Sequence, residues 1–249
     1  SFDKLQKNEY WMYGLHPCLT AINNPIRKIK KILLSRRSER ILNQIPNEKL
    51  HKVEFTDNHT LDDLLPDTKS NQGIAMKVQS LSNIPLVKFQ KHLRQSTKTT
   101  LLSLDKATDS RNIGSIIRSA LAFGVDGIIL PEKGTPKENA VMAKAASGAL
   151  EKMPILRVSN LVRTLNQFKK DNHWVIGLSA QANKNITNFD IMPNIILVLG
   201  SESSGLRKLT NESCDFLFKI KISDEVDSLN LSNAASVALY EICRQRQLT

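Results

Sequence analysis

Short apolar runs alternate with amphipathic stretches throughout the second half of this 249-residue chain. Residues 101–104 and 127–130 are strand candidates, and the apolar runs at residues 175–178 and 195–199 are typical of parallel strands that are buried on both faces of a sheet. Periodicity and alanine-rich composition predict helices at residues 113–121, 138–147, 161–170 and 234–242. Strands that alternate with helices predict an α/β fold with a mostly parallel sheet that is covered on both faces.

The first part of the chain alternates in the same way on a smaller scale. Strand-like segments lie at residues 32–34, 53–55 and 74–78, and helix-like segments lie at residues 15–22, 38–43 and 60–65. This pattern predicts a small N-terminal α/β domain at residues 1–82. Residues 83–99 contain Pro85 and several basic and polar residues, which indicates a linker or an exposed connecting helix before a second domain at residues 100–249.

The chain is strongly basic, with 35 Lys and Arg against 24 Asp and Glu and a formal net charge of +11. A basic chain favours a polyanionic partner, because neutralising phosphates drives nucleic-acid binding. The densest basic cluster is therefore a candidate RNA contact, with a solvated surface as the alternative. It consists of Arg27, Lys28, Lys30, Lys31, Arg36, Arg37 and Arg40. Only 5% of the residues are aromatic, which favours recognition by shape and charge over base stacking.

The composition argues against several other classes of protein. No apolar run reaches the roughly 18 residues of a membrane span, and residues 1–13 lack the apolar stretch of a secretory signal. The 3 cysteines are odd in number and widely spaced, which indicates a reducing compartment rather than a disulfide framework. The 5 histidines are scattered without metal-ligand spacing, so we expect no metal site.

Three polar segments flank the predicted strands and helices of the second domain, at residues 105–114, 200–206 and 227–235. Ligands bind beyond the carboxyl ends of the strands in such sheets, so these segments are candidates for a site. Arg111, Ser115 and Arg118 form one polar stripe on the first predicted helix, where an arginine can grip a phosphate. Taken singly, each segment is also consistent with a plain turn or a helix cap, with Ser232 or Asn233 as the cap in the third.

Taken together, in this order and spacing, the three segments resemble the signature motifs of the SpoU (TrmH-like) family. These are RNA ribose 2′-O-methyltransferases of the SPOUT superfamily. The motifs stand at residues 112–118 (NIGSIIR), 197–206 (LVLGSESSGL) and 228–235 (SLNLSNAA). The front region resembles the substrate-binding domain of RlmB-type ribosomal RNA enzymes at residues 13–16 (YGLH) and 72–74 (QGI). The resemblance covers almost the whole chain.

The resemblance implies features that periodicity does not. The C-terminal SPOUT domain is expected to contain a deep trefoil knot, the front domain to be like ribosomal protein L30e, and the enzyme to work as a homodimer with active sites near the interface. The expected cofactor is S-adenosylmethionine, bent within the knot loops, and backbone contacts to it map to Gly200, Ile220 and Leu229. The functional polar positions map to Asn112, Arg118, Glu202, Ser228 and Asn230.

The chain departs from the family's pattern just before the third motif. The family usually has Ile-Pro-Met followed by a Gly, whereas residues 220–224 read Ile-Lys-Ile-Ser-Asp, with Lys221 at the proline position and Asp224 near the Gly. This departure bears on the rigidity of the cofactor loop, but not on the backbone role of Ile220. Asn233 stands where a small apolar residue is common.

The implied reaction moves a methyl group from the sulfonium of S-adenosylmethionine to a ribose 2′-hydroxyl. Arg118 is the principal catalytic candidate, because it can hold the adjacent phosphate or stabilise negative charge on the 2′-oxygen. Proton removal by the phosphate or by a perturbed arginine stays open. The other polar positions are expected to orient the ribose, the cofactor or Arg118: Asn112, Glu202, Ser228 and Asn230. Arg111 is grouped with the RNA-binding residues.

We therefore expect methylation of a guanosine ribose in 23S ribosomal RNA. The alternatives are a transfer RNA 2′-O-methyltransferase and a non-catalytic RNA-binding ribosome-assembly factor. A dinucleotide-dependent oxidoreductase is disfavoured, because the Gly-rich turn after the first strand and the acid about 20 residues further on are missing. The cytoplasm is the expected location, with a processed organelle form as the alternative because the sequence does not begin with Met.

Overall fold

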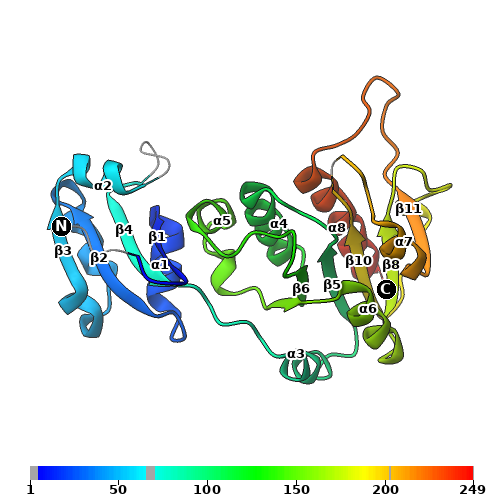
Figure 1. Ribbon diagram of the computed structural model, residues 1–249, viewed down its shortest axis with the longest axis horizontal. Coiled ribbons are helices and arrows are strands. Elements are labelled where there is room, and N and C mark those ends of the chain that lie inside the picture. The colour runs from blue at the N-terminus through cyan, green and yellow to red at the C-terminus, as the bar shows by residue number, and fades with distance from the viewer. Residues whose placement is uncertain (1–4, 66–70, 202, 249) are drawn as a thin grey trace. The chain divides into compact units, whose positions relative to one another are not determined.

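The computed structural model describes residues 5–65, 71–201 and 203–248, and its elements form two compact units (Figure 1). The first unit takes in residues 1–82 and 137–152, and the second takes in residues 83–136 and 153–249. The first unit contains β1 (Glu9–Tyr13), α1 (Leu15–Asn23), β2 (Ile29–Ser35), η1 (Arg36–Gln44), η2 (Asn47–Lys52), β3 (Val53–Thr56), α2 (Asn58–Leu64), β4 (Ile74–Gln79), α5 (Ala140–Ala146) and η4 (Ala149–Glu151).

A mixed four-stranded sheet in the order β1-β4-β2-β3 forms the centre of the first unit. β4 pairs antiparallel with β1 and β2, whereas β2 and β3 are parallel. Trp11, Leu33 and Ala75 belong to one hydrophobic core together with Leu61 of α2. The strands are therefore held both by their hydrogen-bonded ladders and by the removal of apolar side chains from water.

The sequence predicted most elements of this unit, and the differences have local causes. The three predicted strands are confirmed as the cores of β2, β3 and β4, and helices lie at the predicted positions 15–22 and 60–65. The predicted helix at 38–43 lies within a 3₁₀ helix, η1, which is interrupted at Ser38 with φ −109°. β1 was missed because its four last residues are all buried, so no polar–apolar alternation marks it as a strand.

Residues 137–152 pack into the first unit, although they lie between two strands of the second unit in the sequence. There, Arg27 forms ion pairs of 2.5 Å with Glu138 and with Glu151, and its side chain is fully buried. Tyr10 also donates a hydrogen bond of 2.7 Å to Glu138. The prediction that Arg27 contacts RNA is therefore wrong, because its guanidinium does not reach the surface. Buried charges need partners, and these acids stand 111 and 124 residues away in the sequence.

A seven-stranded sheet in the order β7-β6-β5-β10-β8-β11-β9 forms the centre of the second unit, and every strand pairs parallel with its neighbours. β10 lies between β5 and β8, which both precede it in the chain. The trefoil knot stays a prediction. The elements are α3 (Leu86–Leu93), β5 (Thr99–Leu104), α4 (Ser110–Ala122), β6 (Gly127–Pro131), β7 (Ile155–Val158), α6 (Leu161–Lys170), β8 (Trp174–Leu178), β9 (Lys184–Asn185), η5 (Ile186–Asn188), β10 (Asn194–Leu199), α7 (Lys208–Ser213), β11 (Phe216–Lys219) and α8 (Leu231–Leu248).

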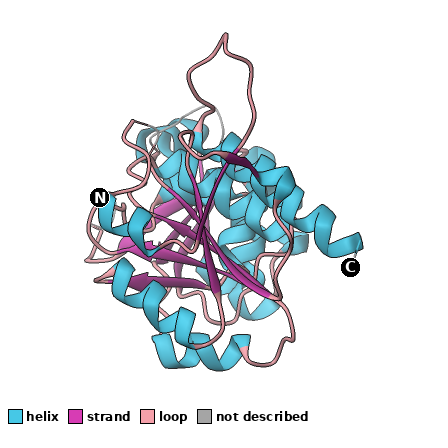
Figure 2. Cartoon of the chain, turned by 90° about the vertical axis from the view of Figure 1, so that its right-hand side faces the viewer, coloured by secondary structure: helices cyan, strands magenta, loops and turns pink. Residues whose placement is uncertain are grey.

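Helices flank this sheet, as Figure 2 shows. Phe89 of α3 and Phe168 of α6 pack in one hydrophobic core with side chains such as Ile196 of β10. The residues next to it along the strand, Ile195 and Leu197, point to the other face and are also fully buried. Burial on both faces explains why these strands are continuous apolar runs, as the sequence predicted.

The four strands predicted for this domain are confirmed as β5, β6, β8 and β10, and the four predicted helices as α4, α5, α6 and α8, of which α5 packs into the first unit. Three short strands, β7, β9 and β11, were not predicted because two to four residues are too few to establish a period. Residues 83–99 contain α3, and its Phe89 is only 1% exposed. This helix therefore belongs to the core of the second unit rather than standing free in solvent.

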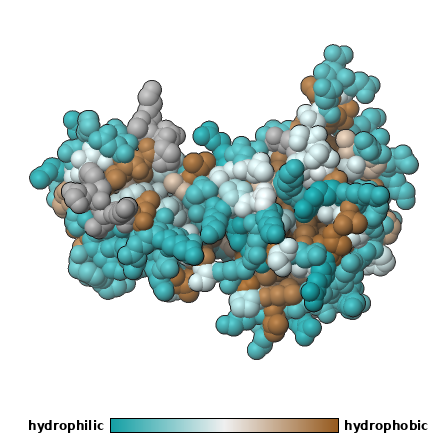
Figure 3. All heavy atoms as spheres, in the orientation of Figure 1, coloured by the Kyte–Doolittle hydropathy of each residue, from teal (hydrophilic) through white to brown (hydrophobic). Residues whose placement is uncertain are grey.

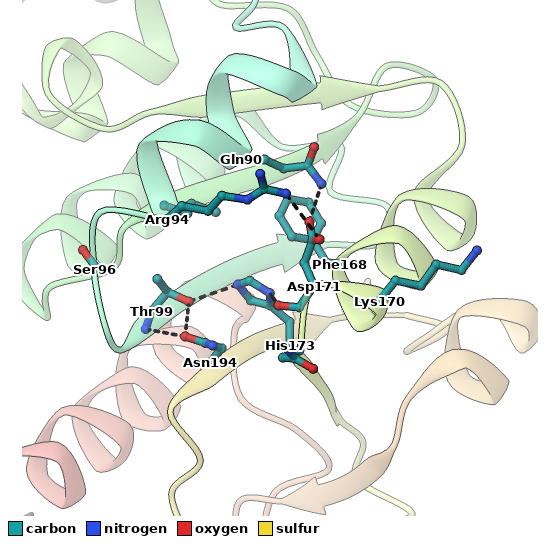
Figure 4. Close-up of a pocket in the computed structure, with 11 residues that line it drawn as sticks. Gln90, Arg94, Ser96, Thr99, Phe168, Lys170, Asp171, His173 and Asn194 are labelled. Carbon is teal, nitrogen blue, oxygen red and sulfur yellow. Dashed lines mark hydrogen bonds and ion pairs between the residues drawn. The ribbon is translucent and has the colours of Figure 1, made fainter.

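A polar joint fixes α3 to the amino ends of the central strands (Figure 4). Gln90 donates a hydrogen bond of 2.7 Å to Asp171, and Arg94 lies 3.6 Å from the same carboxylate. Below them, His173 makes hydrogen bonds of 3.2 Å with the Asp171 carbonyl oxygen and 3.0 Å with the Thr99 hydroxyl. Because the carbonyl oxygen can only accept, the neutral ring carries its proton on Nδ1. Burial lowers the pKa of His173.

Hydrophilic side chains cover most of the face seen in Figure 3, with hydrophobic residues scattered in small groups. Among the residues that the structure describes, no helix combines the length and the apolar composition needed to cross a bilayer.

The joint predicts a pH dependence of stability. In the unfolded chain His173 takes up a proton near its ordinary pKa of about 6.5, whereas in the folded chain its lowered pKa keeps it neutral. Acidification below that value therefore favours the unfolded state. We expect His173→Gln to reduce the fall in urea midpoint between neutral and mildly acidic pH. The matched control is His92→Gln, an exposed residue of α3, which should retain the wild-type pH dependence. Identical pH profiles for wild type and His173→Gln would contradict this prediction.

Candidate active site

The carboxyl ends of β8, β10 and β11 meet at one cavity of about 660 Å³. Because the three strands are parallel and adjacent, the residues that follow them lie at the same edge of the sheet. Gly200, Ile220 and Leu229, the three predicted cofactor contacts, all line this cavity. Its volume lies within the range of about 300–1,000 Å³ that is typical of small-molecule sites.

Residues 200–201 and 203–206 form one wall of the cavity. Ser201 and Gly205 exchange two backbone hydrogen bonds, of 3.0 and 2.9 Å, which fold the segment into a tight turn. A Cβ atom on Gly200 would lie 2.0 Å from the carbonyl carbon of Gly205, so no larger residue fits there. Gly205 itself has φ +63°. The two glycines five residues apart are thus needed by the turn itself.

The third motif begins helix α8 and joins it to the first motif. Asn230 Oδ1 accepts hydrogen bonds from the Ser232 backbone at 2.9 Å and from the Ser232 hydroxyl at 2.6 Å. Asn230 is therefore the capping residue, and the prediction of Ser232 or Asn233 is wrong because the helix begins earlier, at Leu231. The Asn230 amide also donates to Asn112 Oδ1 at 3.2 Å, so two predicted functional residues are brought together.

The chain between β11 and α8 projects from the body of the unit before it joins α8 (Figures 1 and 2). Its last part, with Asp227, Ser228 and Leu229, lines the cavity together with Ile220 at its start. Ser228 and Asp227 are exposed, whereas Leu229 is half-buried. Both polar side chains are therefore open to a ligand and to solvent.

Arg118 is exposed on α4 and does not line this cavity. No hydrogen bond or ion pair joins it to another described residue. Helices α4 and α8 pack side by side, through a 2.8 Å hydrogen bond from Ser236 to Ser119 and an edge-to-face contact of 6.0 Å between the rings of Phe123 and Tyr240. Within one chain, residues of the second and third motifs thus line the cavity. Asn112 is joined to the third motif through Asn230, and Arg118 stands on the outer surface.

The remaining predicted residues are distributed over the surface. Five members of the basic cluster are exposed: Lys28, Lys30, Arg36, Arg37 and Arg40. Lys31 is half-buried and pairs with Glu54 at 3.0 Å. Arg111 is exposed at the start of α4. Glu202 lies outside the described residues.

Sequence reasoning missed the residues that follow β8. Ser179, Ala180 and Gln181 line the cavity, as do Lys208 and Asn211 of α7. Ser179 and Gln181 carried a usable signal, because they are polar residues just after a correctly predicted strand. Within residues 5–65, 71–201 and 203–248, no three His, Cys, Asp or Glu side chains are grouped as metal ligands.

Two family models match the chain. The model described as the SpoU rRNA Methylase family matches residues 99–240, and the model described as RNA 2′-O ribose methyltransferase substrate binding matches residues 11–83. The first covers the cavity and all three motifs.

Individual relatives agree with these models. The chain is 36% identical over 241 residues to the 23S rRNA (guanosine-2′-O-)-methyltransferase RlmB of Pasteurella multocida, covering 94% of this chain and 98% of that protein. It is 34% identical to the RlmB of Coxiella burnetii, covering 95% and 96%. Among solved structures, the SpoU methyltransferase AviRb of Streptomyces viridochromogenes has a TM-score of 0.79 at 22% identity, covering 97% of this chain and 91% of that chain. An AdoMet-bound rRNA methyltransferase of Sinorhizobium meliloti has a TM-score of 0.78 at 22% identity, covering 97% and 89%.

The tight turn at Gly200 predicts that one methyl group added at this residue weakens ligand binding. We expect Gly200→Ala to weaken binding of S-adenosylmethionine at least about tenfold, because the added Cβ must push Gly205 out of the cavity wall. The matched control is Gly124→Ala, where φ is +71° but no atom lies within 4 Å of the added Cβ. Calorimetric titration of both variants measures the effect. Equal affinities for the two variants would be evidence against a role of this turn in the cavity.

Proposed function

This chain belongs to the SpoU rRNA methylase family, and we propose that it transfers a methyl group from S-adenosylmethionine to a ribose 2′-hydroxyl of RNA. The names of its RlmB relatives support a guanosine of 23S ribosomal RNA as the target, and their bacterial origin supports a cytoplasmic location. The observation that carries the proposal is the single cavity shared by Gly200, Ile220 and Leu229, which are separated in the sequence.

The residues around the cavity fit the cofactor. The close approach of Gly200 to Gly205 leaves the wall without a side chain that would fill the space. Leu178, Leu206 and Leu229 supply apolar surface for an adenine ring, while Ser179, Ser201 and Ser228 supply hydroxyl groups for its polar parts. Gly200, Ile220 and Leu229 are the residues that we assign to holding it through their backbones.

When bound, S-adenosylmethionine supplies an activated methyl group on a sulfonium, which is the hard part of the chemistry. The protein must bring the 2′-oxygen into line with that group and support the loss of the hydroxyl proton. Arg118 is exposed and is assigned to the phosphate beside the ribose and to negative charge on the 2′-oxygen. The hydrogen-bonded pair Asn112 and Asn230 orients the ribose, and Ser228, which lines the cavity, hydrogen-bonds nearby. Glu202 keeps its proposed role of orienting Arg118 or a loop amide.

Residues 1–82 bind the RNA, and the methyltransferase domain occupies residues 100–249. Support for the first assignment comes from the substrate-binding family model and from the exposed basic residues of β2 and η1. η1 places Arg36, Arg37 and Arg40 on one short element. Such a group of cations is suited to a phosphate backbone.

The enzyme works as a homodimer, with a second copy on the α4–α8 surface. Val237 and Tyr240 are 44% and 57% exposed on α8 beside Phe123. An interface there also covers helix α4, which carries Arg118, and so accounts for the position of this residue outside the cavity of its own chain.

Replacing Arg118 with Ala tests the activity. We expect methyl transfer to a 23S rRNA transcript to fall roughly 10²–10³-fold, while the affinity for S-adenosylmethionine stays unchanged. The matched control is Arg163→Ala, an exposed arginine of α6, which should retain activity. Transfer of labelled methyl and mass mapping of ribose methylation are the measurements. A wild-type protein that binds RNA without transferring methyl would instead indicate the non-catalytic role.

The RNA contact predicts a steep salt dependence. We expect Arg36→Ala, Arg37→Ala and Arg40→Ala together to weaken RNA binding and to flatten the dependence of log K on log salt by roughly 0.7–0.9 per lost phosphate contact. The control removes three exposed cations of the second unit: Lys133, Arg163 and Lys184. Equal losses in the two triple variants, measured by filter binding, would count against the assignment to residues 1–82.

The proposed dimer is tested by charge on its apolar surface. We expect Val237→Glu with Tyr240→Glu to produce a monomer in sedimentation experiments, because each glutamate would have to be buried in the interface. Val87→Glu is the control, since Val87 is 76% exposed on α3, away from helix α8. A dimer that survives the double substitution would place the interface elsewhere.

A further inference from the structure

Asp105 holds both ends of the segment that forms the glycine-rich wall of the cavity. It is the first residue after β5 and is fully buried. Its backbone N–H donates to the Leu199 carbonyl oxygen at 2.7 Å, where the segment begins. Its carboxylate accepts a hydrogen bond of 2.8 Å from the backbone N–H of Arg207, where the segment ends. One residue therefore fixes the entry and the exit of residues 200–206.

The side chain of Arg207 completes this arrangement. Its Nε donates to Asp105 Oδ1 at 2.7 Å, and its Nη2 forms an ion pair with the same oxygen. The Arg207 side chain is 52% exposed, whereas that of Asp105 is wholly buried. A buried carboxylate is stable only with such partners, so its position is coupled to that of Arg207.

The backbone beside Asp105 is also tightly held. Lys106 has φ +124°, a conformation that residues with a side chain rarely adopt. Strained conformations of this kind persist where the surrounding contacts over-determine the chain. The strain lies directly after Asp105, so it is independent support for a rigid connection between β5 and the cavity wall.

We propose that Asp105 is a positioning residue for the cofactor and that Arg207 is its partner. This proposal rests on the proposed function, because it takes S-adenosylmethionine as the ligand of the cavity. Asp105 does not line the cavity and acts through the segment that it closes, of which Gly200, Gly205 and Leu206 do line it. Releasing the segment at Arg207 lets this wall move away from the cofactor. The affinity for the cofactor then falls even in a protein that is fully folded.

The test compares Asp105→Asn with the wild-type chain. Asparagine keeps one acceptor oxygen and turns an amide group towards a donor of Arg207, so one hydrogen bond is lost. We expect Kd and KM for S-adenosylmethionine to rise at least about tenfold, with RNA affinity unchanged. Calorimetry is carried out at a temperature where circular dichroism shows both proteins fully folded.

A matched control exists at the opposite edge of the same sheet. Asp215 likewise accepts from a backbone N–H, that of Val175 at 2.8 Å, and pairs with Lys169 at 2.8 Å. Asp215→Asn therefore removes a similar clamp at the amino ends of β8 and β11. We expect it to lower the melting temperature while leaving the affinity for S-adenosylmethionine unchanged.

Variants of Arg207 provide a second route if Asp105→Asn does not fold. Arg207→Lys retains the cation and the backbone N–H and is expected to bind S-adenosylmethionine nearly as well as wild type. Arg207→Gln removes the cation and is expected to bind more weakly than Arg207→Lys. Folded Asp105→Asn or Arg207→Gln with wild-type affinity would overturn the positioning role. A wild-type chain that does not bind S-adenosylmethionine would instead overturn the proposed function and, with it, this inference.

Discussion

Parallel pairing of β10 with both β5 and β8 is the constraint on which the second unit depends. The ladder sets Leu199 beside Leu104 on one side and beside Leu178 on the other, so all three strands end at one level. Each strand is buried on both faces, and the polar residues of the site gather where the strands end. Asp105, Ser179 and Gly200 follow those three ends directly. The residues of the site are therefore positioned by the backbone hydrogen bonds between the strands, and not by contacts between the side chains of the motifs.

The fold was predictable wherever a strand or helix was long enough to reveal its period. The runs in β8 and β10, residues 175–178 and 195–199, are apolar throughout, which is typical of a strand covered on both faces. β11 was not predicted, because its four residues, FLFK, are too few to establish a period. In α3, Phe89 and Leu93 stand four residues apart, which is the spacing of one helix face. The basic residues around them favoured an exposed helix instead. The position of β10 between two earlier strands follows from tertiary packing, and no local sequence pattern predicts it.

The candidate site was predictable from motif resemblance to a much greater extent than from periodicity. Gly200, Ile220 and Leu229 are far apart in the sequence, and only a known family pattern groups them. Asn230 was predicted as a site residue but not as the helix cap, and the structure shows that the predicted functional position is also the capping position. Arg118 shows the limit of a single chain: the motif identifies it as a candidate, yet it does not line the cavity that the other motif residues form. A surface that is completed by another molecule cannot be recognised from the local sequence pattern of one chain.

The burial of Arg27 has a consequence for anyone who transplants the front part of this protein. A graft that ends at residue 82 carries the guanidinium away from Glu138 and Glu151, which follow much later in the chain. The recipient protein would then contain a desolvated cation with no neutralising acids, and part of its new core would open to water. Fusions and chimaeras that carry the 137–152 stretch as well, or that exchange Arg27 for an apolar residue of similar length, avoid that defect.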